Sequence, residues 1–202
     1  VPLQAVQQTA TRFGLSHRQV ELIAVENRLL PWRHSRNMGT VGWQGLAKLM
    51  RSTVGVVGLG GLGGYVVEGL ARMGVGHLIL IDGDVFVEHN LNRQLLSHEA
   101  NLGQSKAESA RERVAAVNSA VEVTVYHQFA TRETLPVLLH GADVLVDCTD
   151  RLPIRFVLQD VARDMDIPMV HGAIAGYVGQ VMTILPGDEG LRALYGHGDV
   201  PE

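Results

Sequence analysis

The sequence predicts a doubly wound α/β fold, in which a mostly parallel, Rossmann-like sheet has helices on both faces and follows an N-terminal helical arm. From residue 53 onward, short apolar runs alternate with amphipathic stretches, which is the pattern of consecutive strand and helix units. The run TVGVV at 53–57 is apolar on both sides, as in a buried parallel strand, and a glycine cluster follows it. We therefore assign residues 1–52 to a helical arm of the same domain and residues 53–202 to the Rossmann-like unit.

The helical arm is expected to contain two helices. Ser16 is a good N-cap residue, and the stretch after it carries an apolar stripe that Pro31 would end. A second small helix is expected where Trp43, Leu46 and Met50 recur at helical spacing, and it leads into the first strand.

The Rossmann-like unit is expected to contain six strands and four helices. In the helix after the glycine cluster, Val66, Leu70 and Met73 are spaced to face the sheet, and Gly74 would close the helix. The segment GAIAG at 172–176 is expected to bridge the last two strands, and residues 190–202 are interpreted as loop. The expected strands are 53–57, 77–82, 121–126, 143–148, 168–171 and 177–185, and the later helices lie near 103–118, 134–140 and 154–165.

Length and composition indicate a single cytoplasmic domain. The 202 residues suit one domain, and the net charge of −4 argues against a nucleic-acid partner. No apolar run is long enough to cross a membrane, and no signal peptide is evident. The single cysteine, Cys148, excludes an internal disulfide framework and a cysteine-built zinc site. Because the chain starts at Val1 and stops in a loop-like run, we expect the protein to extend further.

The glycine cluster predicts a nucleotide site. Gly58, Gly60 and Gly63 fit the pattern G-x-G-x-x-G, and Asp82 follows Gly63 by nineteen residues, close to the spacing of a ribose-binding carboxylate. A short strand-to-helix turn and a strand-end cap are the structural alternatives for these residues. The motif alone also fits an NAD-dependent oxidoreductase.

Charged residues further along the chain favour a triphosphate over a nicotinamide dinucleotide. Asn90 and Arg93 follow Asp82 closely, and Lys106 opens a helix whose N-terminal amides could bind the same anion. Asp150 ends a buried strand and suits a magnesium ion. The alternatives are solvated charges for Arg93 and Lys106, and a helix N-cap for Asp150.

These motifs resemble a known family, the ubiquitin-activating-enzyme-like adenylyltransferases of the ThiF/MoeB/HesA type. The resemblance covers about residues 33–185 and is strongest to the shorter ThiF-like proteins. It rests on RHSRN at 33–37, GLGGLGG at 58–64, GVGHLILIDGDVFVEHNLNRQ at 74–94, GQSKAESA at 103–110 and DVLVDCTD at 143–150.

The resemblance implies that residues 53–202 form an ATP-binding adenylation domain. Gly61 and its neighbours would pack against the nucleotide, and Asp82 would bind the ribose hydroxyls with Asp84 nearby. The phosphates would be held by Asn90, Arg93 and Lys106.

Two further residues acquire roles from the resemblance. Asp150 would bind Mg²⁺, and Arg36 would cross a homodimer interface to reach the ATP of the other subunit. The implied catalytic set is therefore Arg36, Arg93, Lys106 and Asp150. The implied reaction joins the C-terminal glycine carboxylate of a small ubiquitin-fold sulfur carrier ending in Gly-Gly to the α-phosphate of ATP, releasing pyrophosphate. Such carriers serve thiamine, molybdopterin or related sulfur transfer.

Departures from the family pattern limit what is carried over. His34, Asn37 and Arg151 stand where many relatives have Tyr, Gln and Asn, although none of these changes removes a phosphate ligand. The two C-x-x-C zinc pairs of many relatives are missing, so neither a zinc site nor a thioester step is predicted. Rival functions are a tRNA-modification dehydratase of the same fold, an NAD-dependent oxidoreductase and a silent dimeric binding module.

Overall fold

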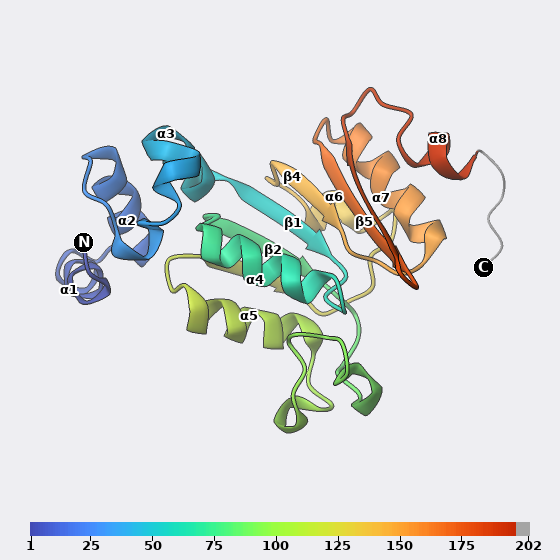
Figure 1. Ribbon diagram of the computed structural model, residues 1–202, viewed down its shortest axis with the longest axis horizontal. Helices are drawn as coiled ribbons and strands as arrows, with labels where there is room; N and C mark the ends of the chain where they lie inside the picture. Colours follow the sequence, from blue (N-terminus) through green and yellow to red (C-terminus); the bar gives the residue numbers. More distant parts are fainter. Residues whose placement is uncertain (197–202) are drawn as a thin grey trace.

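The computed structural model describes residues 1–196 and contains a six-stranded sheet with helices on both faces (Figure 1). The strand order is β3-β2-β1-β4-β5-β6, and every neighbouring pair is parallel except the antiparallel hairpin β5–β6. The fold class predicted from the sequence is therefore confirmed. The strands are β1 (Thr53–Val57), β2 (His77–Ile81), β3 (Glu122–Tyr126), β4 (Val144–Asp147), β5 (Met169–Ala175) and β6 (Val178–Ile184).

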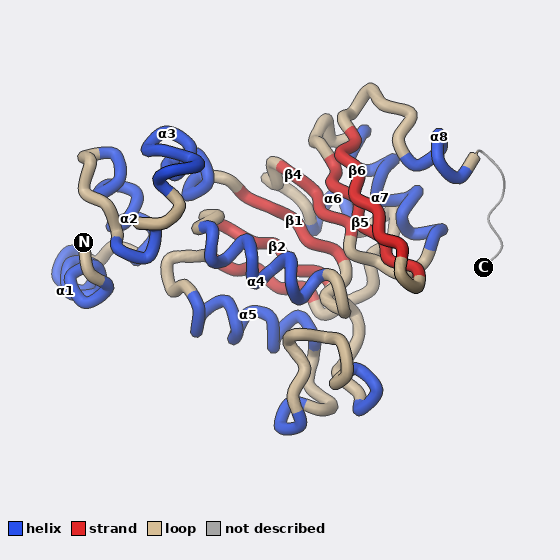
Figure 2. The backbone as a smooth tube through the Cα atoms, in the orientation of Figure 1, coloured by secondary structure: helices blue, strands red, loops and turns tan. Residues whose placement is uncertain are grey.

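Two helices cover each face of the sheet, but they do not cover it evenly (Figure 2). On one face, α4 (Gly63–Met73) and α5 (Lys106–Val117) pack over β1, β2 and β3. On the other face, α6 (Leu135–Leu138) and α7 (Leu152–Asp164) pack against the central strands of the sheet. The spacing of Ala107, Ala110, Val114 and Val117 predicts an apolar stripe on α5, of which the first three residues are fully buried and Val117 is partly buried. Among the helices of residues 1–196, none covers the face of β4–β6 on the α4 side (Figure 1).

The helix α4 presents a different face to the sheet from the one predicted. Val67 and Ala71 are fully buried, whereas Met73 is 38% exposed and Leu70 lies at the margin of the core. The prediction from large apolar side chains therefore placed the sheet-facing side of α4 about one residue away from its true position. Small residues at the contact allow α4 to approach β1 closely, beginning with Gly63, on which a Cβ would lie 1.9 Å from the Gly58 carbonyl oxygen.

The N-terminal arm contains α1 (Leu3–Phe13), α2 (His17–Glu26) and α3 (Met38–Arg51). Ser16 caps α2 through a reciprocal pair of hydrogen bonds with Gln19. The helix α3 contains the apolar positions that predicted it and leads into β1, but it begins at Met38, before the first of them. Two features were not predicted: α1 itself, and the end of α2 at Glu26, well before Pro31. The arm lies at the end of the sheet where β1 begins, and an ion pair between Arg18 and Glu122 ties it to β3.

The C-terminal part differs from the prediction in two places. The strand β5 runs through most of GAIAG, so only Gly176 and Tyr177 separate it from β6. The helix α8 (Leu191–Tyr195) forms where loop was predicted, while residues 197–202 of that segment lie outside the described part of the chain. Five residues carry too little periodicity to predict a helix, and this one is stabilised by packing.

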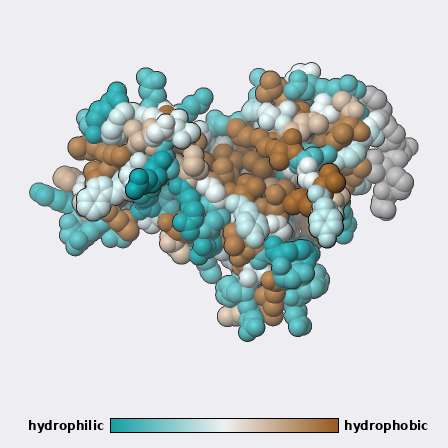
Figure 3. All heavy atoms as spheres, viewed as in Figure 1, coloured by the Kyte–Doolittle hydropathy of each residue, from teal (hydrophilic) through white to brown (hydrophobic). Residues whose placement is uncertain are grey.

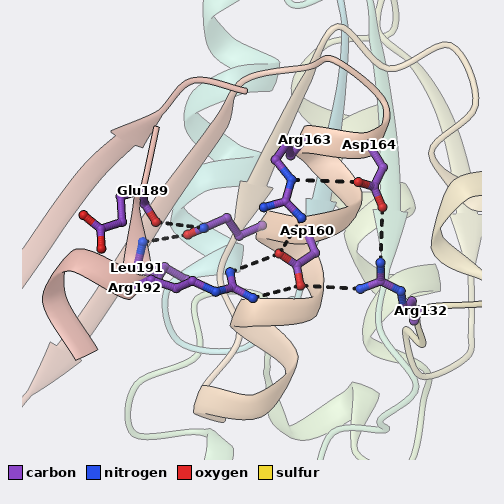
Figure 4. Close-up of polar contacts among 8 residues, drawn as sticks. Arg132, Asp160, Arg163, Asp164, Glu189, Leu191 and Arg192 are labelled. Carbon is purple, nitrogen blue, oxygen red and sulfur yellow. Dashed lines mark hydrogen bonds and ion pairs between the residues drawn. The ribbon is translucent and has the colours of Figure 1, made fainter. Parts of the chain in front are cut away.

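Contacts to α7 hold α8 in place. Arg192 of α8 binds both carboxylate oxygens of Asp160, at 3.0 and 3.1 Å, and Arg132 and Arg163 contact the same carboxylate (Figure 4). Gln159 accepts a hydrogen bond from the Leu191 amide at 2.6 Å. These contacts fix the position of α8 beside β6.

Candidate functional site

The glycine cluster forms a tight loop at the carboxyl end of β1. Gly58 has a φ of 87°, and a Cβ there would lie 2.7 Å from the Cys148 carbonyl oxygen, so this position and Gly63 need glycine for the packing of the loop itself. Gly61 is different, because a Cβ there would only touch Arg93 at 3.8 Å. Two of the glycines predicted to contact the nucleotide, Gly60 and Gly61, therefore have space for a Cβ within the chain itself. The nearest atoms to such a Cβ belong to residues 93 and 94.

Asp82, the predicted ribose ligand, joins the end of β2 to the glycine loop. Its Oδ2 accepts a hydrogen bond from the Leu59 amide at 2.6 Å, and its Oδ1 accepts one from the Asp84 amide at 2.8 Å. Burial raises the pKa of this carboxyl above its usual value, although these two hydrogen bonds act in the opposite direction. Each oxygen retains a lone pair that can accept a hydrogen bond from a ligand hydroxyl.

Lys106 and Asp84 form an ion pair beside Asp82. The Lys106 Nζ lies 2.9 Å from Asp84 Oδ2, and the lysine side chain is only 8% exposed whereas that of Asp84 is 53% exposed. A backbone bridge between Val85 and Ser105 brings the two segments together. The predicted convergence of residues 82–84 with Lys106 is thus seen in the structure, and the ammonium group lies at the N-terminus of α5 as predicted.

The segment after β2 places Arg93 and Gln94 against the glycine loop. Arg93 is exposed, and its guanidinium donates to the His89 carbonyl oxygen at 2.8 Å. Asn90 is buried and has a local role, since its Oδ1 accepts a hydrogen bond from the Val87 amide at 3.0 Å. Gln94 was not assigned a role from the sequence. It is 7% exposed, its Oε1 has no hydrogen-bond partner in the described part of the chain, and it faces Gly60.

Asp150 follows β4 and is exposed. Within the described chain its carboxylate has no hydrogen bond or ion pair, and residue 151 rather than Asp150 occupies the N-cap position of α7. The N-cap alternative therefore does not hold. The preceding turn packs against Gly58 of the glycine loop, so Asp150 lies on the same edge of the sheet as Asp82.

Arg36 does not join this group of residues. Its neighbour Asn37 contacts the Met73 carbonyl oxygen, and His34 packs on Gly74, both at the end of α4 far from the glycine loop. The 11 residues of α4 span about 16 Å, which exceeds the reach of an arginine side chain. Arg36 is exposed and forms no ion pair among residues 1–196.

Cys148 is a core residue. It is 8% exposed, and burial raises the pKa of its thiol to about 12, with the neighbouring Asp147 carboxylate acting in the same direction. A thiol with such a pKa is almost entirely protonated at neutral pH and is a poor nucleophile.

Two buried titratable residues that lie next to the turn before Asp150 were assigned no role from the sequence. Asp147 and His171 are fully buried, and their side chains are 2.6 Å apart. The available signal was a carboxylate in the apolar run DVLVDC, because a buried charge requires a partner.

A glycine loop, a partly buried carboxylate and a lysine at the carboxyl edge of a doubly wound sheet define a nucleotide-binding α/β protein. The sequence profile of the ThiF family matches residues 34–201, and the chain belongs to the ThiF family.

Curated relatives support this assignment. The chain is 39% identical over 171 residues to the SAMP-activating enzyme E1 of Haloferax volcanii, covering 84% of this chain and 63% of that protein. It is 38% identical over 174 residues to the adenylyltransferase and sulfurtransferase MOCS3 of Mus musculus, covering 84% of this chain and 38% of the relative. The chain therefore spans less than two thirds of the length of these relatives.

Solved structures show the same fold. The E. coli tRNA N6-threonylcarbamoyladenosine dehydratase TcdA in complex with ATP has a TM-score of 0.70 and 31% identity, covering 73% of this chain and 61% of that one. E. coli MccB has a TM-score of 0.68 and 26% identity, covering 77% and 49% of the two chains. Within residues 1–196, no helix of this protein has the length and apolar character needed to cross a membrane.

Proposed function

We propose that this protein is an ATP-dependent adenylyltransferase, which activates the C-terminal glycine carboxylate of a small ubiquitin-fold sulfur-carrier protein. The observation that carries the proposal is the convergence of four groups on one edge of the sheet: the glycine loop, Asp82, the Asp84–Lys106 pair and the carboxylate of Asp150, which has no partner among residues 1–196. Family membership and the relatives named above support this type of chemistry.

The proposed reaction requires positioning and charge neutralisation. A carrier carboxylate, already ionised near neutral pH, attacks the α-phosphorus of ATP, so that a new P–O bond forms while the bond to the β-phosphate oxygen breaks. Lys106 and Arg93 supply positive charge for the phosphates, and the partly buried Asp82 orients the ribose. The products are an acyl adenylate and pyrophosphate. No general base is needed.

A magnesium ion fits the residues that are present. Mg²⁺ is usually bound through one or two carboxylates together with substrate phosphates and water, and Asp150 offers one free carboxylate at the required edge. When bound, the ion would neutralise charge on the phosphates.

A protein partner is supported by the uncovered face of β4–β6. Figure 3 shows apolar side chains gathered over these strands beside α4, among which Val181 is 82% and Ile174 is 69% exposed. Val181 pairs across the hairpin with Gly172, and Gly172 contacts Leu62 next to the glycine loop. A carrier lying on this apolar face would have its tail close to the nucleotide.

We also propose a homodimer in which Arg36 of one subunit serves the ATP site of the other. Support comes from the position of Arg36, which is exposed, unpaired among the described residues and too far from the site of its own chain. Mixing inactive Arg36→Ala and Asp150→Ala proteins tests this arrangement. Recovery of part of the activity is expected, and no recovery in dimers shown to have exchanged subunits would contradict it.

The main test is carrier-dependent exchange of labelled pyrophosphate into ATP. Exchange that needs both Mg²⁺ and a carrier ending in Gly-Gly is expected. A carrier lacking its last glycine is the matched control. Absence of exchange, together with tight NAD binding, would favour an oxidoreductase instead.

The second candidate is a tRNA-modification dehydratase that activates a carboxylate on a modified nucleoside. The similarity to TcdA favours it, whereas the net charge of −4 does not suggest an RNA-binding surface. AMP formation that depends on tRNA and not on a carrier would support this alternative. We retain cytoplasmic location as an expectation.

A further inference from the structure

A buried hydrogen-bond network lies beneath the turn that carries Asp150. Asp147 ends β4 and His171 is its register partner on β5, and neither side chain has any exposed surface. The Asp147 Oδ2 lies 2.6 Å from His171 Nδ1. A buried carboxylate is retained only where its partners replace water, so the surroundings of this pair decide what it does.

The partners of His171 fix the position of its proton. Gln180 Nε2 lies 3.0 Å from His171 Nε2 and 2.5 Å from the Tyr195 hydroxyl. Because an amide nitrogen only donates, His171 Nε2 accepts this hydrogen bond, and the ring N–H is at Nδ1. That proton is donated to Asp147, which remains an acceptor. The two hydrogen atoms of the Gln180 amide are both used.

The second oxygen of Asp147 holds the turn. Asp147 Oδ1 accepts hydrogen bonds from the Thr149 amide at 2.9 Å and from the Thr149 hydroxyl at 2.7 Å. Arg155 of α7 donates to the Thr149 carbonyl oxygen at 2.6 Å, and the Cys148 amide donates to Val57 of β1 at 2.9 Å. The main chain is thus fixed at two successive residues immediately before Asp150, whose own side chain remains free.

We propose that the Asp147–His171 pair is a positioning unit, which holds Thr149 and through it aims the Asp150 carboxylate at a divalent cation. Neither residue touches substrate. His171 orients Asp147 by its Nδ1–H, and Asp147 orders the turn. The inference rests on the proposed function, because it uses the magnesium-binding role proposed for Asp150.

Two substitutions of His171 separate positioning from general damage. His171→Asn retains an N–H near the place of Nδ1 and can still donate to Asp147. His171→Gln places its amide near Nε2 and leaves Asp147 without that donor. In full-length protein, the Mg²⁺ dependence of binding of a non-hydrolysable ATP analogue is measured by calorimetry, with His140→Gln, at an exposed histidine, as control.

His171→Gln is expected to raise the Mg²⁺ concentration for half-saturation by about tenfold, the usual effect of losing a partner behind a metal ligand. Affinity for the analogue without Mg²⁺ is expected to stay within about twofold, and His171→Asn is expected to lie close to the wild type. Hydrogen exchange of the Thr149 amide gives a readout without turnover, and it is expected to be faster in His171→Gln than in His171→Asn.

Thr149→Val covers the case in which the histidine variants do not fold. It removes only the hydroxyl donor to Asp147 and is expected to raise the half-saturating Mg²⁺ concentration several-fold. Wild-type Mg²⁺ dependence in both His171→Gln and Thr149→Val would overturn the inference. Pyrophosphate exchange by the wild-type protein would still support the proposed function in that case. If ATP binding by the wild-type protein does not depend on Mg²⁺, the proposed role of Asp150 is refuted, and both proposals fail with it.

Discussion

Gly61→Ala provides a direct test of whether the glycine loop contacts a nucleotide. A Cβ at this position would lie 3.8 Å from Arg93 Cγ and 3.9 Å from the Arg93 carbonyl oxygen, which are ordinary contacts. The free energy of unfolding is therefore expected to change by no more than about 0.5 kcal/mol. If ATP packs on the loop, the added methyl group overlaps the ligand and is expected to cost about 1–3 kcal/mol of binding, which is about a fivefold to 150-fold loss of affinity.

Gly63→Ala is the matched substitution with the opposite expectation. Its Cβ would lie 1.9 Å from the Gly58 carbonyl oxygen, so the loop or α4 must move. Such overpacking costs about 1–3 kcal/mol, which lowers the melting temperature of a domain of this size by about 2–12 °C. Thermal denaturation and calorimetric titration with ATP measure both variants. Wild-type ATP affinity in Gly61→Ala would refute the nucleotide contact, and wild-type stability in Gly63→Ala would refute the packing argument.

Three further predictions concern charges and the thiol. Lys106→Met retains the buried stem of the side chain but removes the ammonium group, and it is expected to slow pyrophosphate exchange by about 10²–10³, whereas the exposed Lys48→Met should not. Hydrogen bonds from Arg113 hold the pKa of Glu68 below its usual value, so this carboxylate stabilises the fold above its unfolded pKa and ceases to do so as the pH falls through its folded pKa. Glu68→Gln is accordingly expected to lower the melting temperature by about 1–4 °C at pH 7 but not at strongly acidic pH, and an equal loss at both would contradict the assignment. Cys148, whose pKa is raised to about 12 by burial, is expected to resist alkylation at pH 8 in the folded protein, and Cys148→Ala should retain pyrophosphate exchange; loss of exchange in a folded variant would contradict its structural role.

Elements with a strong local pattern could be predicted from the sequence, and elements held by distant contacts could not. The run at 53–57 and the apolar stripe of α5 each carry their own signal, and both are found where expected. The helix α8 depends on Arg192 and on the Leu191 amide meeting side chains of α7, and five residues do not contain that information. The face of α4 was misplaced because hydrophobicity favours large side chains, whereas close approach to β1 requires small ones.

The same division applies to the candidate site. The resemblance assigned Asp84 and Lys106 to one nucleotide site, and the two are paired in the structure because parallel strands end at a common edge and the helix α5 begins there. A partner for Asp147 could not be chosen, since the chain has nine histidines and the one that pairs with it lies 24 residues away on another strand.

Arg36 shows how a short separation in sequence can mislead about position. It precedes the glycine loop by only 22 residues in the numbering, from 36 to 58, yet it packs near the opposite end of α4. The chain enters the sheet at the start of β1 and must cross its full length before the loop begins, so any residue of the arm lies at the far edge. An arginine there can serve an ATP site only in another subunit, and the mixed-subunit experiment therefore tests the only route open to it.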